Sequence, residues 1–516
     1  MLHADVVGER ARVTPDRLAI VDLETGLRLS YRQVDERASA CARVWRESLG
    51  LQPGDRVALL SENRLEFIDA FFAAAKSGIV LVPLGTRLTA TELRAILSDC
   101  APRALIYDGG HAEVVRGLGG VASIESWVAL DRPALPGHAR QSALLAGLAT
   151  GRFERERVSP EAACCLLYTS GTTGRPKGVI LPHRMVAWNG YNTVISWQLR
   201  DDDVTSVFTP LYHAGGLGVF LVPLLAIGGT VVLHRGFDAA EAWAAIERER
   251  CTVVFGVPTI FKRLAEAPAF ATVDLSRVRW LISGGAPLPA HLVHAYQARG
   301  VVLKQGYGLT EVGVNCFTMN AEDAGRKAGS VGRPLLFTEA RLIDEAGGEV
   351  AGGEVGELLL RGPHVCRGYW NRPEITALSL DAEGWFHTGD LARRDAEGFF
   401  TIAGRRNDML ISGGVNVYPA EIEGELLQHE AVADAAVVGV PDETWGEVGV
   451  AFLVLRPGAA PPSPADLGRF LERRLARFKL PRAYRFVDAL PRTPYGKVVK
   501  AQLQDTYRAQ TPIPPE

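Results

Sequence analysis

The chain has 516 residues, more than one hydrophobic core normally supports, so at least two domains are expected. Hydrophobic residues make up 47% of it and charged residues 22%, as in an ordinary globular protein. The net charge of -3 argues against nucleic acid or an anionic membrane surface as a partner. No run approaches the ~18 apolar residues of a membrane-spanning helix, so no integral membrane segment is expected.

The ends and the cysteines of the chain favour a cytoplasmic location. The first twelve residues carry charged side chains and lack the apolar stretch of a signal peptide. The seven cysteines form no CxxC pair and lie in apolar or mixed surroundings. We therefore expect reduced cysteines in the core and a cytoplasmic protein.

The first part of the chain alternates between strand-like and helix-like patterns. Strands are expected at 56–60, 80–82 and 104–107. A helix between the first two strands has Phe67, Ala70, Phe71 and Ala74 on one face. The capping-box spacing from Thr89 to Glu92 predicts the start of the next helix. This alternation indicates a parallel or mixed sheet covered by helices, whereas the polar stretch 131–160 is expected to be a long surface connection.

A loop of glycines, hydroxyls and one lysine follows at 169–178. Its glycines free the backbone to bring N–H groups close to an anion, and its hydroxyls add further donors. Only eight of the 56 basic residues in the chain are lysines, so Lys177 suggests a need for a compact, mobile ammonium. The glycine spacing differs from that of a Walker loop. We interpret the loop as a phosphate cradle; the alternative is a surface turn.

Three further motifs lie downstream, each weak when taken singly. They are Gln305-Gly306-Tyr307-Gly308-Leu309-Thr310-Glu311, His387-Thr388-Gly389-Asp390 and Pro491-Arg492-Thr493-Pro494-Tyr495-Gly496-Lys497. Past about residue 400 the pattern changes to short strands, such as 436–438 and 449–454, with one amphipathic helix that opens at Ser463-Pro464. A small α+β domain is therefore expected there, joined through Gly404-Arg405-Arg406-Asn407.

The order and content of these motifs resemble the adenylate-forming superfamily, which includes acyl-CoA synthetases, adenylation domains of peptide synthetases and firefly-type luciferases. The resemblance covers nearly the whole chain. It implies an α/β fold in which a large N-terminal domain of mixed sheets covered by helices spans 1–404. A hinge at 405–407 would lead to a small mobile α+β domain at 408–516.

The resemblance implies how the large domain binds ATP and Mg²⁺. The loop at 169–178 would hold the β- and γ-phosphates, Thr310 would contact the α-phosphate, and Glu311 would help to bind Mg²⁺. Tyr307 would stack on adenine, while Asp390 and Arg405 would reach the ribose. A core tyrosine and a loop-capping aspartate remain the alternatives for Tyr307 and Asp390. The nucleotide set is Thr169, Ser170, Gly171, Thr172, Thr173, Gly174, Lys177, Gly285, Ala286, Pro287, Gly306, Tyr307, Asp390 and Arg405.

The resemblance also assigns a role to the small domain. Lys497 would bridge the substrate carboxylate and the α-phosphate, and the small domain would deliver it by closing on the large one. A rotation would then expose a coenzyme A tunnel lined by Ser412, Gly413 and Gly414, with Trp445 near the coenzyme A nucleotide. Two positions depart from the family: Asn407 replaces a charged hinge residue, and Val415 replaces a common glutamate.

The substrate is expected to be a hydrophobic carboxylic acid larger than acetate. Amino-acid-activating relatives carry an aspartate where this chain has His213, and acetate-specific relatives carry a tryptophan where it has Gly308. A medium- or long-chain fatty acid is predicted first and an aromatic acid second. His213 is a candidate for gating the pocket or orienting the carboxylate, the alternative being a buried histidine bonded to backbone. Candidate lining residues are Val219, Phe220, Leu224, Val314, Met319, Gly284 and Gly285.

The leading functional hypothesis is an acid–thiol ligase that makes acyl-CoA from a carboxylic acid, ATP and coenzyme A. The alternatives are a ligase that loads a carrier protein, a luciferase-like oxygenase and a non-catalytic nucleotide-binding relative. The C-terminus lacks the Ser-Lys-Leu signal of beetle luciferases, and an insertion typical of carrier-loading ligases was not found. Many relatives are dimers, so a homodimer is a further expectation.

Overall fold

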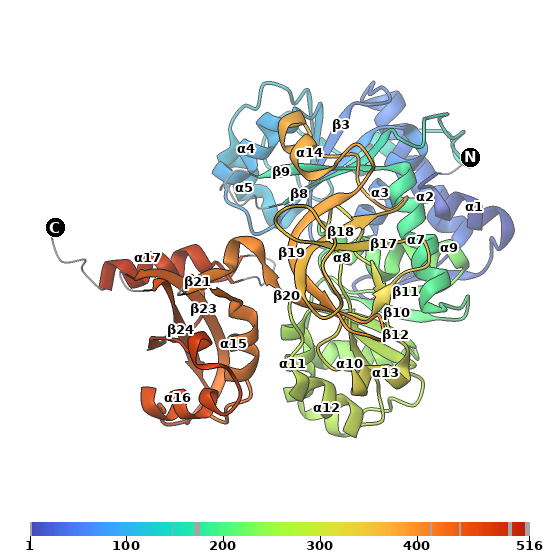
Figure 1. Ribbon diagram of the computed structural model, residues 1–516. Coiled ribbons are helices and arrows are strands. Elements are labelled where there is room, and N and C mark those ends of the chain that lie inside the picture. Colours follow the sequence, from blue (N-terminus) through green and yellow to red (C-terminus); the bar gives the residue numbers. More distant parts are fainter. Residues whose placement is uncertain are drawn as a thin grey trace.

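The computed structural model describes residues 3–146, 148–169, 176–412, 415–442, 445–493 and 498–510. These form a large N-terminal body and a small C-terminal domain, which Figure 1 shows in orange to red beside it. The predicted mixed α/β fold with two domains of unequal size is therefore confirmed.

A seven-stranded sheet lies in the first half of the chain, in the order β7-β6-β5-β3-β4-β8-β9. All its pairings are parallel except that of β8 with β9. The strands are β3 (Arg56–Leu60), β4 (Val80–Leu84), β5 (Ala104–Tyr107), β6 (Ser126–Ala129), β7 (Ala139–Arg140), β8 (Ala163–Thr169) and β9 (Lys177–Pro182). The three strands predicted in this region are confirmed.

The rest of the large domain contains four further sheets. A four-stranded sheet in the order β10-β11-β1-β2 is made of β10 (Val204–Val207), β11 (Thr230–Leu233), β1 (Leu18–Asp22) and β2 (Arg28–Ser30). A parallel sheet contains β12 (Val253–Gly256), β13 (Trp280–Ser283) and β14 (Leu303–Gln305). An antiparallel sheet contains β17 (Glu339–Ile343), β18 (Val355–Arg361), β19 (Phe386–Arg394) and β20 (Phe400–Arg405), and β15 (Phe317–Thr318) pairs with β16 (Arg333–Pro334).

Helices cover these sheets, and local sequence explains where several of them begin. Thr89 and Glu92 form the predicted capping box before α4, and Ser30 and Gln33 form another before α2. The helices of the large domain are α1 (Val6–Val13), α2 (Tyr31–Arg43), α3 (Leu65–Ser77), α4 (Ala90–Cys100), α5 (Ala112–Leu118), α6 (Gln141–Leu145), α7 (His183–Trp197), α8 (Ala214–Gly216), α9 (Val222–Ile227), α10 (Ala239–Arg248), α11 (Pro258–Glu266), α12 (Ala290–Ala298), α13 (Ala321–Arg326) and α14 (Pro373–Ser379).

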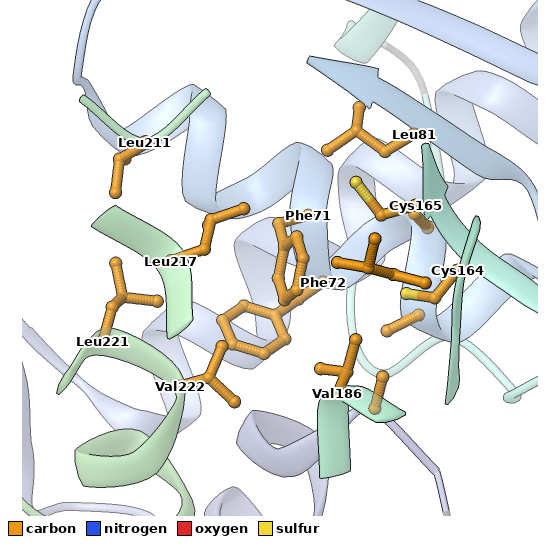
Figure 2. Close-up of a cluster of buried hydrophobic side chains, with 14 of the residues drawn as sticks. Phe71, Phe72, Leu81, Cys164, Cys165, Val186, Leu211, Leu217, Leu221 and Val222 are labelled. Atoms are coloured by element: carbon orange, nitrogen blue, oxygen red, sulfur yellow. The ribbon is translucent and has the colours of Figure 1, made fainter. Parts of the chain in front are cut away.

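The main core lies between the seven-stranded sheet and the helices on one of its faces. Figure 2 shows Phe71 and Phe72 of α3 packed among side chains from β4, β8, α7 and the segment 211–222. Each fully buried phenylalanine contributes about 1.5–3 kcal/mol relative to an exposed one. All seven cysteines are buried and free of disulfides, as predicted. Burial raises the pKa of Cys100 to about 12, so this thiol stays protonated.

The stretch 131–160 has more structure than the sequence indicated. It adds β7 to the edge of the large sheet and contains the short helix α6. Arg152 of this stretch also donates to the backbone carbonyl of Gly8 near the N-terminus. Elements of two and five residues are too short to leave a hydrophobic period in the sequence.

The small domain consists of one sheet flanked by helices. Its strands are β21 (Leu410–Ser412), β22 (Val415–Val417), β23 (Val432–Asp442), β24 (Gly446–Leu455) and β25 (Ala483–Phe486). Its helices are α15 (Pro419–Leu426), α16 (Pro464–Glu472) and α17 (Lys500–Gln510). The helix predicted at Ser463-Pro464 is confirmed, because the Ser463 side chain caps α16 by accepting from the backbone N–H of Asp466.

Candidate functional site

The predicted phosphate loop leaves the large sheet between β8 and β9. Thr169 and Lys177 lie opposite each other at the open end of this antiparallel pair. Ser170, Gly171, Thr172, Thr173 and Gly174 lie outside the described residues. A Cβ on Gly178 would lie 2.9 Å from the Tyr168 ring, so the start of β9 requires glycine there. The frame of the loop is thus fixed at both of its ends.

The three-stranded parallel sheet brings two predicted segments together. Gly285, Ala286 and Pro287 follow β13, and Gly306 and Tyr307 follow the neighbouring β14. The backbone N–H of Gly306 donates to Ser283 O at 2.7 Å. Because the carboxyl ends of parallel strands meet at one edge of a sheet, both segments lie where ligands commonly bind in α/β proteins.

Tyr307, Asp390 and Arg405 form one hydrogen-bonded cluster. The Tyr307 hydroxyl donates to Asp390 Oδ2 at 2.5 Å, and Arg405 Nε lies 2.7 Å from Asp390 Oδ1. Asp390 on β19 is 3% exposed and pairs in register with Arg405 on β20. Burial and the charge of Asp390 raise the pKa of Tyr307, so its hydroxyl remains a donor. The fold therefore brings together three side chains that are far apart in sequence.

Thr310 and Glu311 lie in the turn after Tyr307, where the Leu309 N–H donates to Gly313 O. The Tyr369 hydroxyl donates to Glu311 Oε1 at 3.0 Å, and the Cys366 N–H donates to Glu311 O at 2.7 Å. Across the described residues, no three His, Cys, Asp or Glu side chains gather as metal ligands. A single half-buried carboxylate fits Mg²⁺ held mainly by phosphate oxygens and water, because this ion rarely takes an all-protein cage.

His213 caps the short helix α8, with its Nδ1 accepting from the Gly215 N–H at 3.2 Å. Next to it, the Phe255 ring lies 3.2 Å from where a Cβ on Gly215 would be and 3.4 Å from that of Gly284. His213, Phe255 and two glycines thus face one small region between α8 and the three-stranded sheet.

Gly308 is fixed by a close backbone approach. A Cβ there would lie 2.3 Å from the carbonyl carbon and oxygen of Val314, so any side chain would require the backbone to move. Val314 also lies against Gly218, where a Cβ would meet its Cγ2 at 2.7 Å. The absence of a bulky residue at 308 therefore follows from local packing.

The predicted apolar lining separates into two groups in the structure. Val219, Phe220 and Leu224 are buried in a cluster with Trp197 and Trp280, which Val314 borders. Met319 belongs to a different cluster with Ala324 and Phe399. Met319 therefore does not join the others in one wall.

Sequence reasoning missed two residues of this region. Asn63, from the loop before α3, accepts from the Leu211 N–H at 2.8 Å and donates to Thr209 O at 3.0 Å, which holds the segment that leads to His213. Tyr369 contacts Glu311 as described above. Neither lies in one of the motifs, and a polar or aromatic residue in a loop has no periodic signal.

Two of the small-domain candidates, Ser412 and Trp445, lie where β21 meets β24. Ser412 ends β21, is 8% exposed and pairs with Gly446. Trp445 is 42% exposed, and the Arg482 guanidinium lies 5.9 Å from its ring centroid. Gly413, Gly414 and Lys497 lie outside the described residues. Lys500 pairs with Glu423 at 2.8 Å, as expected of a structural lysine.

The residues on the two sides of Asn407 form ion pairs with different domains. Arg405 pairs with Asp390, and Arg406 pairs with Glu357 at 3.2 Å, both in the large domain. Asp408 lies 3.9 Å from Lys500 of the small domain. The contacts thus change from one domain to the other within three residues.

A surface cavity of about 590 Å³ lies away from this region, beside α1 and the segment 152–157. Of its arginines, Arg155 pairs with Glu9 at 2.8 Å and Arg152 lies 3.8 Å from Asp35. The described helices contain no stretch long and apolar enough to span a membrane.

Comparison with known proteins identifies the family. The family described as AMP-binding enzyme matches residues 7–370, and the AMP-binding enzyme C-terminal domain matches residues 421–497. The chain belongs to the AMP-binding enzyme family. As the sequence predicted, it is an adenylate-forming acyl-CoA synthetase, an acid–thiol ligase whose reaction uses ATP, Mg²⁺ and coenzyme A.

Its relatives act on both aromatic and fatty acids, according to their names. The feruloyl-CoA synthase of an Amycolatopsis species is 40% identical over 501 residues, covering 96% of this chain and 97% of the relative. The long-chain-fatty-acid–CoA ligase FadD13 of Mycobacterium tuberculosis is 37% identical and covers 98% of both chains. The structure of the anthranilate CoA ligase AuaEII with anthranoyl-AMP matches with a TM-score of 0.91 at 29% identity, over 99% of both chains.

Proposed function

We propose that this enzyme converts a hydrophobic carboxylic acid larger than acetate into its coenzyme A thioester. The observation that carries this proposal is the Tyr307, Asp390 and Arg405 cluster, which lies one turn from Thr310 and Glu311 and near a region lined by glycines and Phe255. Nucleotide-binding groups and an uncharged acyl region are what carboxylate activation requires.

Aromatic acids are the first substrates to test. The Phe255 ring packs against the glycines at 215 and 284, and an aromatic ring beside glycine backbone favours contact with another planar group. The names of the feruloyl-CoA synthase and the anthranilate ligase point the same way. Medium- and long-chain fatty acids, preferred on sequence grounds, are the second candidates, because FadD13 aligns over 98% of this chain.

We propose that the large domain aligns two anions for the first half-reaction. The loop at 169–178, with Lys177, would hold the β- and γ-phosphates, Thr310 the α-phosphate, and Asp390 and Arg405 the ribose. A carboxylate oxygen of the acid attacks the α-phosphorus, and the bond to pyrophosphate breaks. Mg²⁺, when bound through Glu311, would neutralise phosphate charge.

Lys497 would neutralise the charge that develops between the carboxylate and the α-phosphate. We place the large domain at 1–404, the hinge at 405–407 and the small domain at 408–516. The change of ion-pair partners between Arg406 and Asp408 supports a pivot at Asn407. Rotation there would bring Ser412, Gly413, Gly414 and Trp445 to the coenzyme A thiol, which attacks the acyl carbon and releases AMP.

We also propose a cytoplasmic location, supported by the seven buried cysteines, none of which forms a disulfide.

The test is acid-dependent AMP release with aromatic, fatty and short acids, with and without coenzyme A, and mass spectrometry of the thioester. We expect coenzyme A-dependent turnover that Lys497→Ala lowers by at least about 100-fold. Thioester formation from supplied acyl-AMP should survive in this variant. Lys262→Ala, an exposed lysine of the large domain, is the matched control.

Three outcomes would contradict parts of this proposal. AMP release that ignores coenzyme A would indicate another acceptor, such as a carrier protein or oxygen. Turnover confined to acetate would exclude the hydrophobic pocket. Full adenylation by Lys497→Ala would remove that lysine from the first half-reaction.

A further inference from the structure

Tyr369 lies between two side chains that are expected to meet ATP and its metal ion. Its hydroxyl donates to Glu311 Oε1 at 3.0 Å, and the Lys177 ammonium lies 5.7 Å from the centroid of its ring. One side chain thus touches the acidic residue of one motif and the lysine of another.

The backbone holds Tyr369 rigidly against β9, the strand that begins with Lys177. The Trp370 N–H donates to Gly178 O at 2.7 Å, and the Ile180 N–H donates to Gly368 O at 2.9 Å. These bonds continue β9 sideways into the segment 366–370 and set the Tyr369 ring beside Lys177.

The same segment fixes the backbone of Glu311. The Cys366 N–H donates to Glu311 O at 2.7 Å, while the Tyr369 hydroxyl holds the carboxylate. Glycine is required at 368, because φ is +115° and a Cβ would lie 2.3 Å from the Thr376 side chain. The Thr376 hydroxyl then accepts from the Tyr369 N–H at 2.9 Å. Each of the two partners of Tyr369 is therefore tied to one rigid segment.

We propose that Tyr369 is a positioning residue that holds the Glu311 carboxylate and the Lys177 ammonium at a fixed separation for the metal-bound polyphosphate of ATP. The proposal rests on the roles of Glu311 and Lys177 in the proposed function. Tyr369 itself need not touch the nucleotide.

The chemistry of the contact suits this role. The Tyr369 hydroxyl can only donate to an ionised carboxylate, so it engages one oxygen and orients the other. The ring face favours a nearby ammonium. Burial and the charge of Glu311 raise the pKa of Tyr369, which keeps the hydroxyl protonated at neutral pH.

The two contacts can be separated by substitution. Tyr369→Phe removes the hydrogen bond to Glu311 and keeps the ring beside Lys177, whereas Tyr369→Leu removes both. Tyr296→Phe is the matched control, because that buried hydroxyl donates to Phe261 O in another core cluster. Thermal unfolding of all three variants checks that they fold.

The experiment is calorimetric titration of ATP into the full chain, with Mg²⁺ and with EDTA. We expect Tyr369→Phe to weaken binding about three- to tenfold with Mg²⁺ and to leave binding in EDTA unchanged. Tyr369→Leu should weaken binding in both conditions, because Lys177 also loses its support. In a protein that already carries Glu311→Gln, adding Tyr369→Phe should cost little further ATP affinity, as expected for groups that act together.

The proposal would be overturned if Tyr369→Phe lost the same ATP affinity with Mg²⁺ as with EDTA, or lost none with Mg²⁺. It would also be overturned if the losses of ATP affinity from Tyr369→Phe and Glu311→Gln added fully in the double variant. Coenzyme A thioester formation by the unmodified enzyme is measured separately. If the unmodified enzyme forms no thioester, the proposed function is refuted. If it forms the thioester but Tyr369→Phe binds ATP with Mg²⁺ as tightly as the unmodified enzyme, this inference alone is refuted.

Discussion

The Tyr307, Asp390 and Arg405 cluster and the junction to the small domain use the same charged residue types but differ in how many bonds hold each charge. Asp390 has a side chain 5% exposed and holds both Tyr307 and Arg405. At the junction the Arg406 side chain is 56% exposed and pairs with Glu357, which is 12% exposed, and the contact between Asp408 and Lys500 spans 3.9 Å. Buried, multiply bonded charges are costly to separate, whereas exposed pairs contribute about 0–1 kcal/mol.

This difference suits an enzyme with one fixed and one moving part. If the cluster binds the ribose as proposed, its hydrogen bonds are already formed and need not reorganise in each cycle. A junction held by single, partly exposed pairs could exchange them at lower cost, as the proposed rotation requires. Three substitutions test whether the two regions really differ in this way.

The largest effect is expected at Asp390. Asp390→Asn removes the charge that pairs with Arg405 and one acceptor for the ribose hydroxyls, so kcat/KM for ATP should fall by about 10- to 100-fold. Steady-state kinetics with ATP varied measures it. Asp395→Asn is the control, because Asp395 lies in the turn of the same hairpin and pairs with Lys327, which follows α13. A loss under threefold would mean that Asp390 is a structural residue of the β19 and β20 hairpin.

A smaller effect is expected at Glu357, which pairs with Arg406. Glu357→Gln keeps both linker arginines but weakens the pair, so trypsin should cut after Arg405 or Arg406 about two- to fivefold faster. Limited proteolysis followed by mass spectrometry measures the rate. Glu339→Gln weakens another arginine–glutamate pair on this sheet, the one with Arg361, in which the glutamate is more exposed, and should leave linker cleavage unchanged. Unchanged cleavage in Glu357→Gln would show that this pair does not restrain the junction.

The sequence predicted regular elements well where a local signal exists. The strands at 56–60 and 104–107 match β3 and β5, and the capping box at Thr89 and the cap at Ser463 mark helix starts that the structure keeps. The strand and helix within 131–160 were missed, because two and five residues give no period. Local patterns therefore sufficed for the frame that carries the motifs.

The site itself was only partly predictable. Motif residues such as Tyr307 and Asp390 stand out in sequence, but their mutual hydrogen bond depends on how β14 and β19 pack. Asn63 and Tyr369 act through tertiary contacts that no spacing encodes. Residue type also failed to distinguish a pocket wall from core, as the separate location of Met319 shows.

The smallest expected effect concerns Lys304, a buried charge on β14 next to the nucleotide motif. Its ammonium lies 3.7 Å from the Trp280 ring centroid and donates to Met319 O at 3.2 Å. Burial, reinforced by the charge of Arg279, lowers the pKa of Lys304 to about 7. If the rigid surroundings tolerate this buried charge, Lys304→Met should change the free energy of unfolding and leave nucleotide binding intact.

The direction in which stability changes with pH follows from proton binding by Lys304. Between pH 7 and about 10 the unfolded lysine holds its proton and the folded one loses it, so wild-type stability rises with pH relative to Lys304→Met. With each pH unit, the wild type can gain at most about 1.4 kcal/mol of unfolding free energy relative to Lys304→Met. The stability advantage of Lys304→Met should therefore be largest at or below pH 7. Urea unfolding of both proteins from pH 6.5 to 9.5 measures it, with exposed Lys262→Met as control. If the stability difference between wild type and Lys304→Met stays constant across this range, the Trp280 ring and Met319 O keep Lys304 charged in the folded state. The region around β14 would then tolerate a buried charge as well as the junction tolerates its exposed ones.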